Sequence, residues 1–276
     1  CASEAQRLFY LGLLLALGRL NPLLFESDPR LESLIRIAPF GVQTPRPTVK
    51  RDLTRPAILF GGIYDWYDPI LAIDAVAIAR KSIPALTLTF TRHPNPELTP
   101  QGKAADAVRH VKSKQCESFV RFEPWTAYDE RGAFFDRFTL ALLAFPHSLE
   151  TELAMRTRIY DFLWGALPVI SSAAPGTGEL LASYGAGVTV EGETPEAFAA
   201  AILATLRDRA NYDSMVGGTG AFVRAHQWRS VLEPLVEFIR APHFDETKEV
   251  FAASLQVPER PPSILDRIKR RIGGRT

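Results

Sequence analysis

The sequence predicts an α/β fold in which a mostly parallel β-sheet is covered by helices on both faces. From Ala57 onward, short apolar runs alternate with stretches of helical periodicity, which is the pattern of consecutive β-α units. With 276 residues, of which 46% are hydrophobic and 23% charged, the chain is long enough to bury a core of this kind. We expect this domain over residues 51–240, preceded by a segment of residues 1–50 and followed by an extension of residues 241–276.

Composition excludes several classes of function. The formal net charge is +1, which offers no basic excess for binding nucleic acid. The two cysteines, Cys1 and Cys116, are too few for a metal cluster or a disulfide framework, and their scarcity fits a reducing, cytoplasmic compartment. Because the chain starts with Cys and enters a helical pattern at once, without a signal-peptide pattern, we interpret it as a piece of a longer polypeptide.

The segment before residue 51 predicts helices, a strand and a linker. Residues 5–20 form the most apolar run, but it falls short of the ~20 apolar residues that span a bilayer. Ser3 and Gln6 have the spacing of a capping box, so a buried soluble helix capped by Ser3 is favoured over a membrane span. After it we expect a short helix over 28–34, a strand over 35–42 and a polar linker over 43–56.

The alternation from Ala57 onward gives the elements of the domain in order. The predicted strands cover residues 57–60, 86–90, 120–122, 140–145, 169–170 and 188–190. The predicted helices cover residues 68–81, 101–113 and 127–137, then about three or four turns after Pro146, and finally 178–184, 195–206, 208–225 and 229–240. Pro69 in a first helical turn and Thr194 as a helix cap support two of these boundaries.

The chain ends in a proline-containing extension with a basic terminus. Over residues 264–272, isoleucine and leucine side chains at helical spacing alternate with arginine and lysine. One interpretation is an amphipathic helix that touches an anionic membrane surface. A solvated helix or a fraying tail is the favoured interpretation.

Candidate site residues follow the predicted strands, because ligands bind an open parallel sheet beyond the carboxyl ends of its strands. Gly61 and Gly62 follow the first strand of the domain, where glycines let backbone amides approach a phosphate, although a plain tight turn explains them as well. Asp65 and Trp66 lie in the same loop and face the expected cleft, unless the aspartate caps a helix. The G-x-G-x-x-G fingerprint is absent, which argues against a nicotinamide dehydrogenase.

Two further candidates follow the next strands. Arg92 comes after the strand at 86–90, and its guanidinium fork suits a pyrophosphate, while a solvated arginine is the simpler interpretation. Trp125 comes after the strand at 120–122 and either stacks on a nucleobase or is a core or rim aromatic.

The densest polar set lies in the stretch PHSLETELAMRTRIYDFLWGALPVISS, from Pro146 to Ser172. Its apolar residues can form the buried stripe of a helix on a sheet. Packing does not explain its polar residues, which are Glu150, Glu152, Arg156, Thr157, Arg158 and Asp161. No Ser-His-Asp series, H-E-x-x-H motif, P-loop or zinc spacing is present. The sequence therefore predicts a site of electrostatic positioning rather than one with a covalent nucleophile.

This stretch resembles the donor-sugar segment of retaining glycosyltransferases of the GT-B architecture, the family 4-like group 1 enzymes. In that family an acidic residue ahead of a Gly-x-Pro-Val turn holds the ribose, and Asp161 stands there, before Gly165, Pro168 and Val169. The first acidic position of the family pattern holds Leu153 here, with two glutamates nearby. Two motifs at the junction between the family's domains match as well: Ser3-Glu4 and the run from Ile37 to Val42.

The resemblance implies a Rossmann-like, nucleotide-sugar-binding C-terminal domain at residues 51–240. Residues 1–50 would then be the tail of the N-terminal, acceptor-binding domain and the linker. The implied activity is transfer of a sugar from a nucleotide-sugar to a glycan or lipid-linked acceptor, with retention, without a cofactor or an obligatory metal, in surface polysaccharide or glycan biosynthesis. The implied catalytic residues are Glu150, Glu152 and Arg158, and the implied donor-binding residues are Gly61, Gly62, Asp65, Trp66, Arg92, Trp125, Arg156, Thr157 and Asp161, with Asp161 on the ribose.

Two alternatives stay open. A sugar-nucleotide epimerase or hydrolase shares the two-domain fold and would need acid-base residues in the cleft, for which His147 and Glu152 are the candidates. A non-catalytic binding protein that kept the fold is the other.

Overall fold

The sheet of this chain has six parallel strands. A computed structural model describes residues 1–98 and 100–254. The strands are β1 (Ala57–Gly62), β2 (Thr87–Thr91), β3 (Val120–Glu123), β4 (Leu140–Leu143), β5 (Val169–Ser172) and β6 (Gly187–Val190). They lie in the order β3-β2-β1-β4-β5-β6, and every pair is parallel. The strand order therefore reverses between β1 and β4, in the centre of the sheet.

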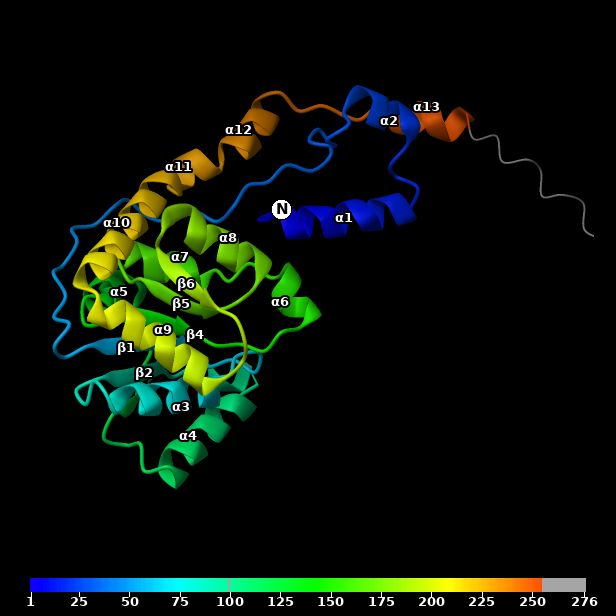
Figure 1. Cartoon of the computed structure of the whole chain (residues 1–276). Coiled ribbons are helices and arrows are strands. Elements are labelled where there is room, and N and C mark those ends of the chain that lie inside the picture. Colours follow the sequence, from blue (N-terminus) through cyan, green and yellow to red (C-terminus); the bar gives the residue numbers. More distant parts are fainter. Residues whose placement is uncertain (99, 255–276) are drawn as a thin grey trace, which may run out of the picture.

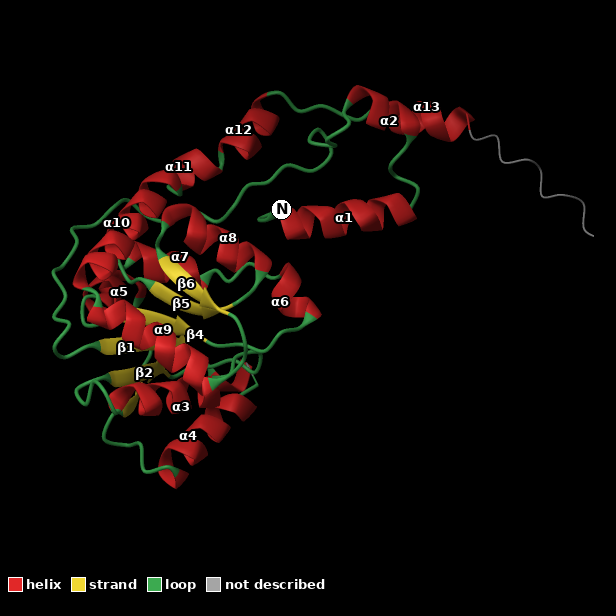
Figure 2. Cartoon of the chain, viewed as in Figure 1, coloured by secondary structure: helices red, strands yellow, loops and turns green. Residues whose placement is uncertain are grey.

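Helices cover both faces of the sheet (Figures 1 and 2). On one face lie α3 (Pro69–Arg80), α4 (Gly102–Ser113) and α9 (Pro195–Arg207); on the other lie α5 (Arg131–Phe135), α7 (Arg158–Trp164) and α8 (Pro175–Tyr184), with α10 (Arg209–Ala225) packed on α7. The prediction of a parallel sheet covered on both faces is confirmed. The four central strands are almost wholly buried, whereas the edge strands β3 and β6 are partly exposed. Together with the inner faces of the helices the strands form one large hydrophobic core.

Side-chain caps and prolines set the starts of several helices. Asp68 accepts a hydrogen bond from the Leu71 N–H at 3.0 Å and Pro69 follows it, so α3 starts at the predicted place. The Asp68 N–H also donates to the Ala144 carbonyl at 2.8 Å, which ties the start of α3 to the end of β4. Thr194 caps α9, as predicted.

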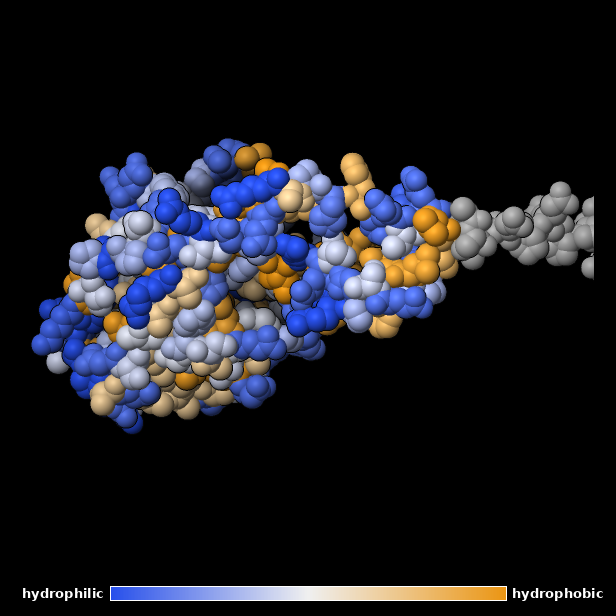
Figure 3. All heavy atoms as spheres, turned by 90° about the horizontal axis from the view of Figure 1, so that it is seen from above, coloured by the Kyte–Doolittle hydropathy of each residue, from blue (hydrophilic) through white to orange (hydrophobic). Residues whose placement is uncertain are grey.

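The first helix, α1 (Glu4–Ala16), is capped by Ser3 as predicted, but it is not a buried helix. Only Leu11 is buried, while apolar side chains on several sides of α1 stay exposed, namely Leu8, Phe9, Tyr10, Leu13 and Leu15. Leu11 forms a small separate cluster with Leu24 and Leu31. Next to this cluster, α2 (Pro22–Ser27) lies beside α13 (Thr247–Ser254), away from the sheet (Figure 1). In the space-filling view, apolar atoms gather on this part of the chain, next to the grey atoms (Figure 3).

The other elements predicted before the domain are corrected by the structure. The helix expected over 28–34 lies earlier, at α2, because the Asn21 side chain caps it and Pro22 occupies its first position. The strand expected over 35–42 does not form, since no neighbouring strand pairs with it; only Val42 makes an isolated bridge, to Gln227. Residues 43–56 run without helix or strand, as predicted for a linker.

Later predictions fail mainly where one expected helix is interrupted. The helix expected over 127–137 consists of a 3-10 turn, η2 (Tyr128–Glu130), and the short α5. The helix expected after Pro146 is split into α6 (Leu149–Leu153) and α7, because Ala154 is extended. The helix expected over 229–240 is split into α11 (Trp228–Val231) and α12 (Glu233–Arg240). A further 3-10 turn, η1 (Pro96–Leu98), precedes α4, and α8 starts at Pro175 rather than at residue 178.

The predicted amphipathic helix at 264–272 lies outside the described residues. Within the described part of the chain, no helix combines the length and the apolar content needed to cross a bilayer.

Candidate functional site

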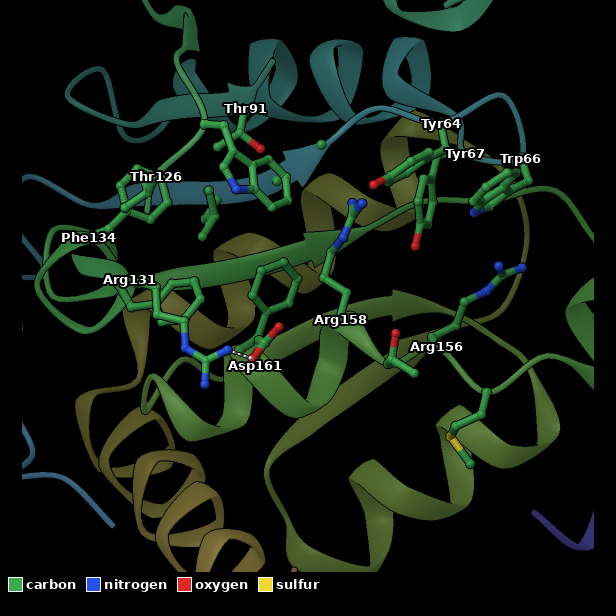
Figure 4. A pocket seen from close by; sticks show the side chains of 18 of the residues that line it. Tyr64, Trp66, Tyr67, Thr91, Thr126, Arg131, Phe134, Arg156, Arg158 and Asp161 are labelled. Carbon is green, nitrogen blue, oxygen red and sulfur yellow. Dashed lines mark hydrogen bonds and ion pairs between the residues drawn. The ribbon is translucent and has the colours of Figure 1, made fainter. Parts of the chain in front are cut away.

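A cavity of about 760 Å³ lies at the carboxyl ends of the central strands, where the strand order reverses. This is the place where open parallel sheets bind ligands. Its walls come from the end of β1 and the following loop, the end of β2, the segment after β3, α5, and the segment from α6 to α7 (Figure 4). It brings together nine of the twelve predicted site residues: Gly61, Gly62, Trp66, Trp125, Glu150, Arg156, Thr157, Arg158 and Asp161.

Arg158, the first residue of α7, reaches into the middle of this cavity (Figure 4). One guanidinium nitrogen donates to the Phe60 carbonyl at 3.1 Å, and the guanidinium carbon lies 4.5 Å from the ring centre of Tyr67. Gly61 has φ +83°, and a Cβ atom added there would lie 3.4 Å from Arg158 Cδ. Among the described residues, no carboxylate forms an ion pair with Arg158. Its charge is therefore free to meet an anion.

Asp161 and Arg131 form an ion pair at 2.8 Å on one side of Arg158 (Figure 4). The Arg131 guanidinium is held between aromatic rings, with its carbon 4.0 Å from the ring centre of Tyr128 and 4.6 Å from that of Trp164. Burial raises the pKa of Asp161, and the positive charges of Arg131 and Arg158 offset part of this rise. The half-exposed carboxylate keeps one face toward the cavity and can accept hydrogen bonds from a ligand.

Glu150 and Arg156 form a second ion pair, on the other side of Arg158. The two terminal nitrogens of Arg156 donate to the two carboxylate oxygens of Glu150, at 3.0 and 2.6 Å. Arg156 is buried, and its guanidinium carbon lies 4.8 Å from the ring centre of Phe145. Its Nε is buried without a partner among the described residues. Because the pair is bidentate, the charge of the buried Arg156 is balanced within the protein by Glu150, which is exposed.

Three predicted residues lie outside the cavity. Asp65 accepts a hydrogen bond from the Lys103 N–H at 3.0 Å at the start of α4, so its carboxylate serves as a helix cap. Glu152 pairs with His147 at 3.1 Å beside a second, smaller cavity of about 370 Å³. Arg92 has an exposed side chain, and its backbone N–H donates to the Glu123 carbonyl at 2.8 Å, which extends the pairing of β2 with β3.

The cavity also contains residues that the sequence did not reveal: Leu59, Tyr64, Tyr67, Thr91, Thr126, Tyr128, Arg131, Phe134, Phe135, Ala154, Met155 and Phe162. The run from Tyr64 to Tyr67 carries three aromatic residues in a loop after β1, and this cluster was a usable signal. Arg131 gave none, because its place beside Asp161 depends on how α5 packs against α7.

Within the described part of the chain, no group of three or more His, Cys, Asp or Glu side chains is placed to hold a metal ion. The cations that line the cavity are arginines, and a guanidinium can neutralise phosphate oxygens and donate hydrogen bonds to them.

Known protein families and curated proteins give no match to this sequence. Solved structures do. A complex of the Anabaena protein Alr3699/HepE with UDP and glucose is 15% identical, with a TM-score of 0.56 over 68% of this chain and 48% of that chain. The pneumococcal O-GlcNAc transferase GtfA in complex with UDP and GlcNAc is 13% identical, with a TM-score of 0.59 over 80% of this chain and 44% of that chain.

A third structure covers one domain. The C-terminal domain of the glycosyl transferase group 1 family protein LpcC from Francisella tularensis is 16% identical, with a TM-score of 0.51 over 67% of this chain and 97% of that domain. The chain thus spans about half the length of the first two proteins and nearly all of the third. At this level of identity the likeness concerns the fold. The chain therefore has the Rossmann-like fold of the C-terminal domain of GT-B glycosyltransferases.

Proposed function

We propose that the cavity binds a nucleotide-sugar and that residues 51–240 are the donor-binding domain of a retaining glycosyltransferase. The observation that carries this proposal is Arg158, a guanidinium in the centre of a cavity at the switch point of the sheet, with no carboxylate partner among the described residues. A free guanidinium at this position suits a diphosphate. The solved structures with UDP and a sugar support the same class of ligand.

The two ion pairs suggest how the ligand is oriented. Arg158 lies between Asp161 on one side and Arg156 on the other (Figure 4), and Arg156 is bound to Glu150. With the diphosphate at Arg158, the ribose hydroxyls would donate to Asp161, and the nucleobase would lie toward Trp125. The sugar would then lie toward Glu150, whose carboxylate is available to its hydroxyls.

In this arrangement the reaction depends on electrostatics. The diphosphate gains charge as the bond to the anomeric carbon breaks, and Arg158 stabilises that charge without a metal ion. The acceptor hydroxyl attacks the anomeric carbon from the side on which the diphosphate leaves, so the configuration is retained, and its proton passes to an oxygen of the departing diphosphate. Glu152 lies outside the main cavity, so Glu150 is the glutamate we assign to the sugar.

The acceptor would be held by a further domain, of which residues 1–50 are the tail. The chain spans about half of the first solved structures it matches, and α1 exposes many apolar side chains. We assign a glycan or lipid-linked acceptor to that domain, surface polysaccharide or glycan biosynthesis as the process, and the cytoplasm as the site of the reaction. We assign residues 241–276 to an extension that follows the donor-binding domain along the sequence.

The epimerase or hydrolase alternative has less support. Its candidate acid-base residues, His147 and Glu152, face the smaller cavity rather than the one that holds Arg158.

A thermal-shift panel tests the proposal with UDP, GDP and ADP, their glucose conjugates and the corresponding nucleosides. A ligand at 100 times its Kd stabilises the folded state by about 2.7 kcal/mol, so at least one diphosphate should raise the Tm clearly while its nucleoside does so much less. If none of the diphosphates raises the Tm, the fold serves a non-catalytic role and the proposed function is wrong.

A further inference from the structure

A column of aromatic rings extends from Arg158 toward the mouth of the cavity. The rings of Tyr64 and Trp66 are stacked, with their centres 4.8 Å apart and their planes 6° from parallel. The Arg158 guanidinium lies over Tyr64, 5.4 Å from its centre. Tyr67 is buried beside the column, with its ring centre 6.2 Å from those of Tyr64 and of Trp66 (Figure 4).

The column leaves one aromatic surface open to a ligand. Arg158 and Trp66 both lie against Tyr64, which is partly buried, whereas Trp66 is 44% exposed and lines the cavity. Exposing an indole costs hydrophobic free energy unless a partner covers it. The stacking on Tyr64 also orders the indole before any ligand arrives, which reduces the entropy lost on binding.

The ligand that fits this surface has an apolar face and a polar rim. A pyranose ring has both, since its C–H bonds gather on its faces and its hydroxyls project from its edge. Resting on the proposed function, we infer that Trp66 is a stacking surface for the pyranose ring of the donor. The column starts at Arg158, and Trp66 comes after Tyr64 in it. With the diphosphate bound at Arg158, the pyranose ring attached to that diphosphate is therefore the part of the donor that can reach Trp66.

The charges at this end of the cavity select a neutral sugar. The Arg156 guanidinium lies 5.7 Å from the ring centre of Tyr67, so the pair of Glu150 and Arg156 borders the same aromatic group. Arg156 is already bound by both oxygens of Glu150. A uronic acid would bring a second carboxylate next to Glu150, and among the described residues that line the cavity the only cation without a carboxylate partner, Arg158, is the one assigned to the diphosphate. The substrate class is therefore a nucleoside diphosphate linked to a neutral hexopyranose.

Calorimetry with matched probes tests this inference. The probes are UDP and UDP-glucose, GDP and GDP-glucose, and ADP and ADP-glucose, and the pair that the unmodified chain binds best is used. Trp66→Ala should raise the Kd of the glucose conjugate about tenfold while changing the Kd of the diphosphate less than about twofold. Trp66→Phe keeps an aromatic face and should recover most of the lost affinity. The matching glucuronic acid conjugate should bind more weakly than the glucose conjugate.

Trp125→Ala is the matched control, because it removes a 51% exposed tryptophan that lines the cavity from the segment after β3, where the proposed arrangement places the nucleobase. Trp125→Ala should weaken the binding of the diphosphate and of its glucose conjugate by a similar factor. If Trp66→Ala also weakens the binding of both ligands by the same factor, or weakens the binding of neither, the inference that Trp66 stacks on the sugar is wrong while the proposed function stands. If the glucuronic acid conjugate binds as well as the glucose conjugate, the selection for a neutral sugar is overturned. If the unmodified chain binds no probe of any pair, the proposed function fails, and this inference fails with it.

Discussion

Gly61 brings the end of β1 close to the Arg158 side chain. Its φ of +83° lies in the region that favours glycine, and it follows an irregularity in the pairing of β1 with β2. A Cβ atom there would lie 3.4 and 3.5 Å from atoms of the Arg158 side chain, including the guanidinium carbon. The sequence suggested that glycines at this turn admit a phosphate; in the structure the positive φ requires glycine at position 61, and the Arg158 side chain lies at van der Waals distance from that position.

Gly61→Ala should reduce both stability and ligand affinity. A non-glycine residue in the left-handed region costs about 1–2 kcal/mol, which denaturant unfolding would detect. Relief of the strained φ would turn the peptide between residues 60 and 61, whose Phe60 carbonyl accepts the hydrogen bond of Arg158, so calorimetry should show weaker binding of the best diphosphate.

Gly192→Ala is the control for this change. Gly192 has φ +88° with no atom within 4 Å of an added Cβ, so it carries a similar backbone cost at a site away from the cavity. Gly192→Ala should lose about as much unfolding free energy as Gly61→Ala and keep its affinity for the diphosphate. If the two variants bind equally well, the role assigned to Gly61 is wrong.

At the scale of single residues, position along the chain predicted nine of the residues that line the cavity. Gly61 lies at the end of β1, Trp66 and Trp125 follow strands, and residues at the carboxyl ends of parallel strands meet at one edge of the sheet. The partner of Asp161 was not predictable, since Arg131 is 30 residues away and reaches it only through the packing of Phe135 against Phe162. The capping role of Asp65 was an open alternative, but its target, α4 rather than the nearer α3, depends on tertiary structure.

At the scale of elements, the linker 43–56 holds α5 and α7 in place. Arg46 donates to both carboxylate oxygens of Asp136, at 2.8 and 2.6 Å, just after α5. The buried Arg51 donates to the Gly165 carbonyl at 3.0 Å, just after α7, and lies 3.5 Å from Asp136. Since α5 carries Arg131 and α7 carries Asp161, these contacts support the ion pair in the cavity.

Asp136→Ala should therefore destabilise the chain by about 2–3 kcal/mol, because it leaves a buried guanidinium without its carboxylate. Burial already lowers the pKa of Arg51, and Asp136 opposes that effect. Asp213→Ala removes the carboxylate of an exposed pair with Arg209 and should cost less than about 1 kcal/mol. Equal losses of unfolding free energy in the two variants would contradict this account of the linker.

The elements that the sequence predicted wrongly have two physical causes. Apolar periodicity reports which face of a segment is buried, but not where its backbone leaves a helix. At Ala154 the backbone turns extended, with φ −77° and ψ 134°, and this break sends Arg156 into the core against Glu150. The run over 35–42 has the composition of a strand, yet a strand forms only where a neighbour supplies hydrogen bonds.

At the scale of the whole molecule, the cavity lies at the point where the strand order reverses, which is where an open parallel sheet is expected to bind a ligand. The repeated β-α pattern was sufficient to predict the parallel sheet, and the solved GT-B structures have the same fold. The part formed by α1, α2 and α13 was not predictable, because it depends on contacts between residues more than 200 positions apart, such as that of Asn21 with Thr247.

The central claim is that Arg158 binds the diphosphate of a nucleotide-sugar in the cavity between β1 and β4. Calorimetry of the best diphosphate with Arg158→Ala tests it most directly, with Arg109→Ala, which removes an exposed arginine on α4, as the control. Loss of charge-assisted hydrogen bonds should raise the Kd for Arg158→Ala about tenfold or more, while Arg109→Ala should bind like the unmodified chain. An unchanged Kd for Arg158→Ala, or an equal loss in both variants, would contradict the claim.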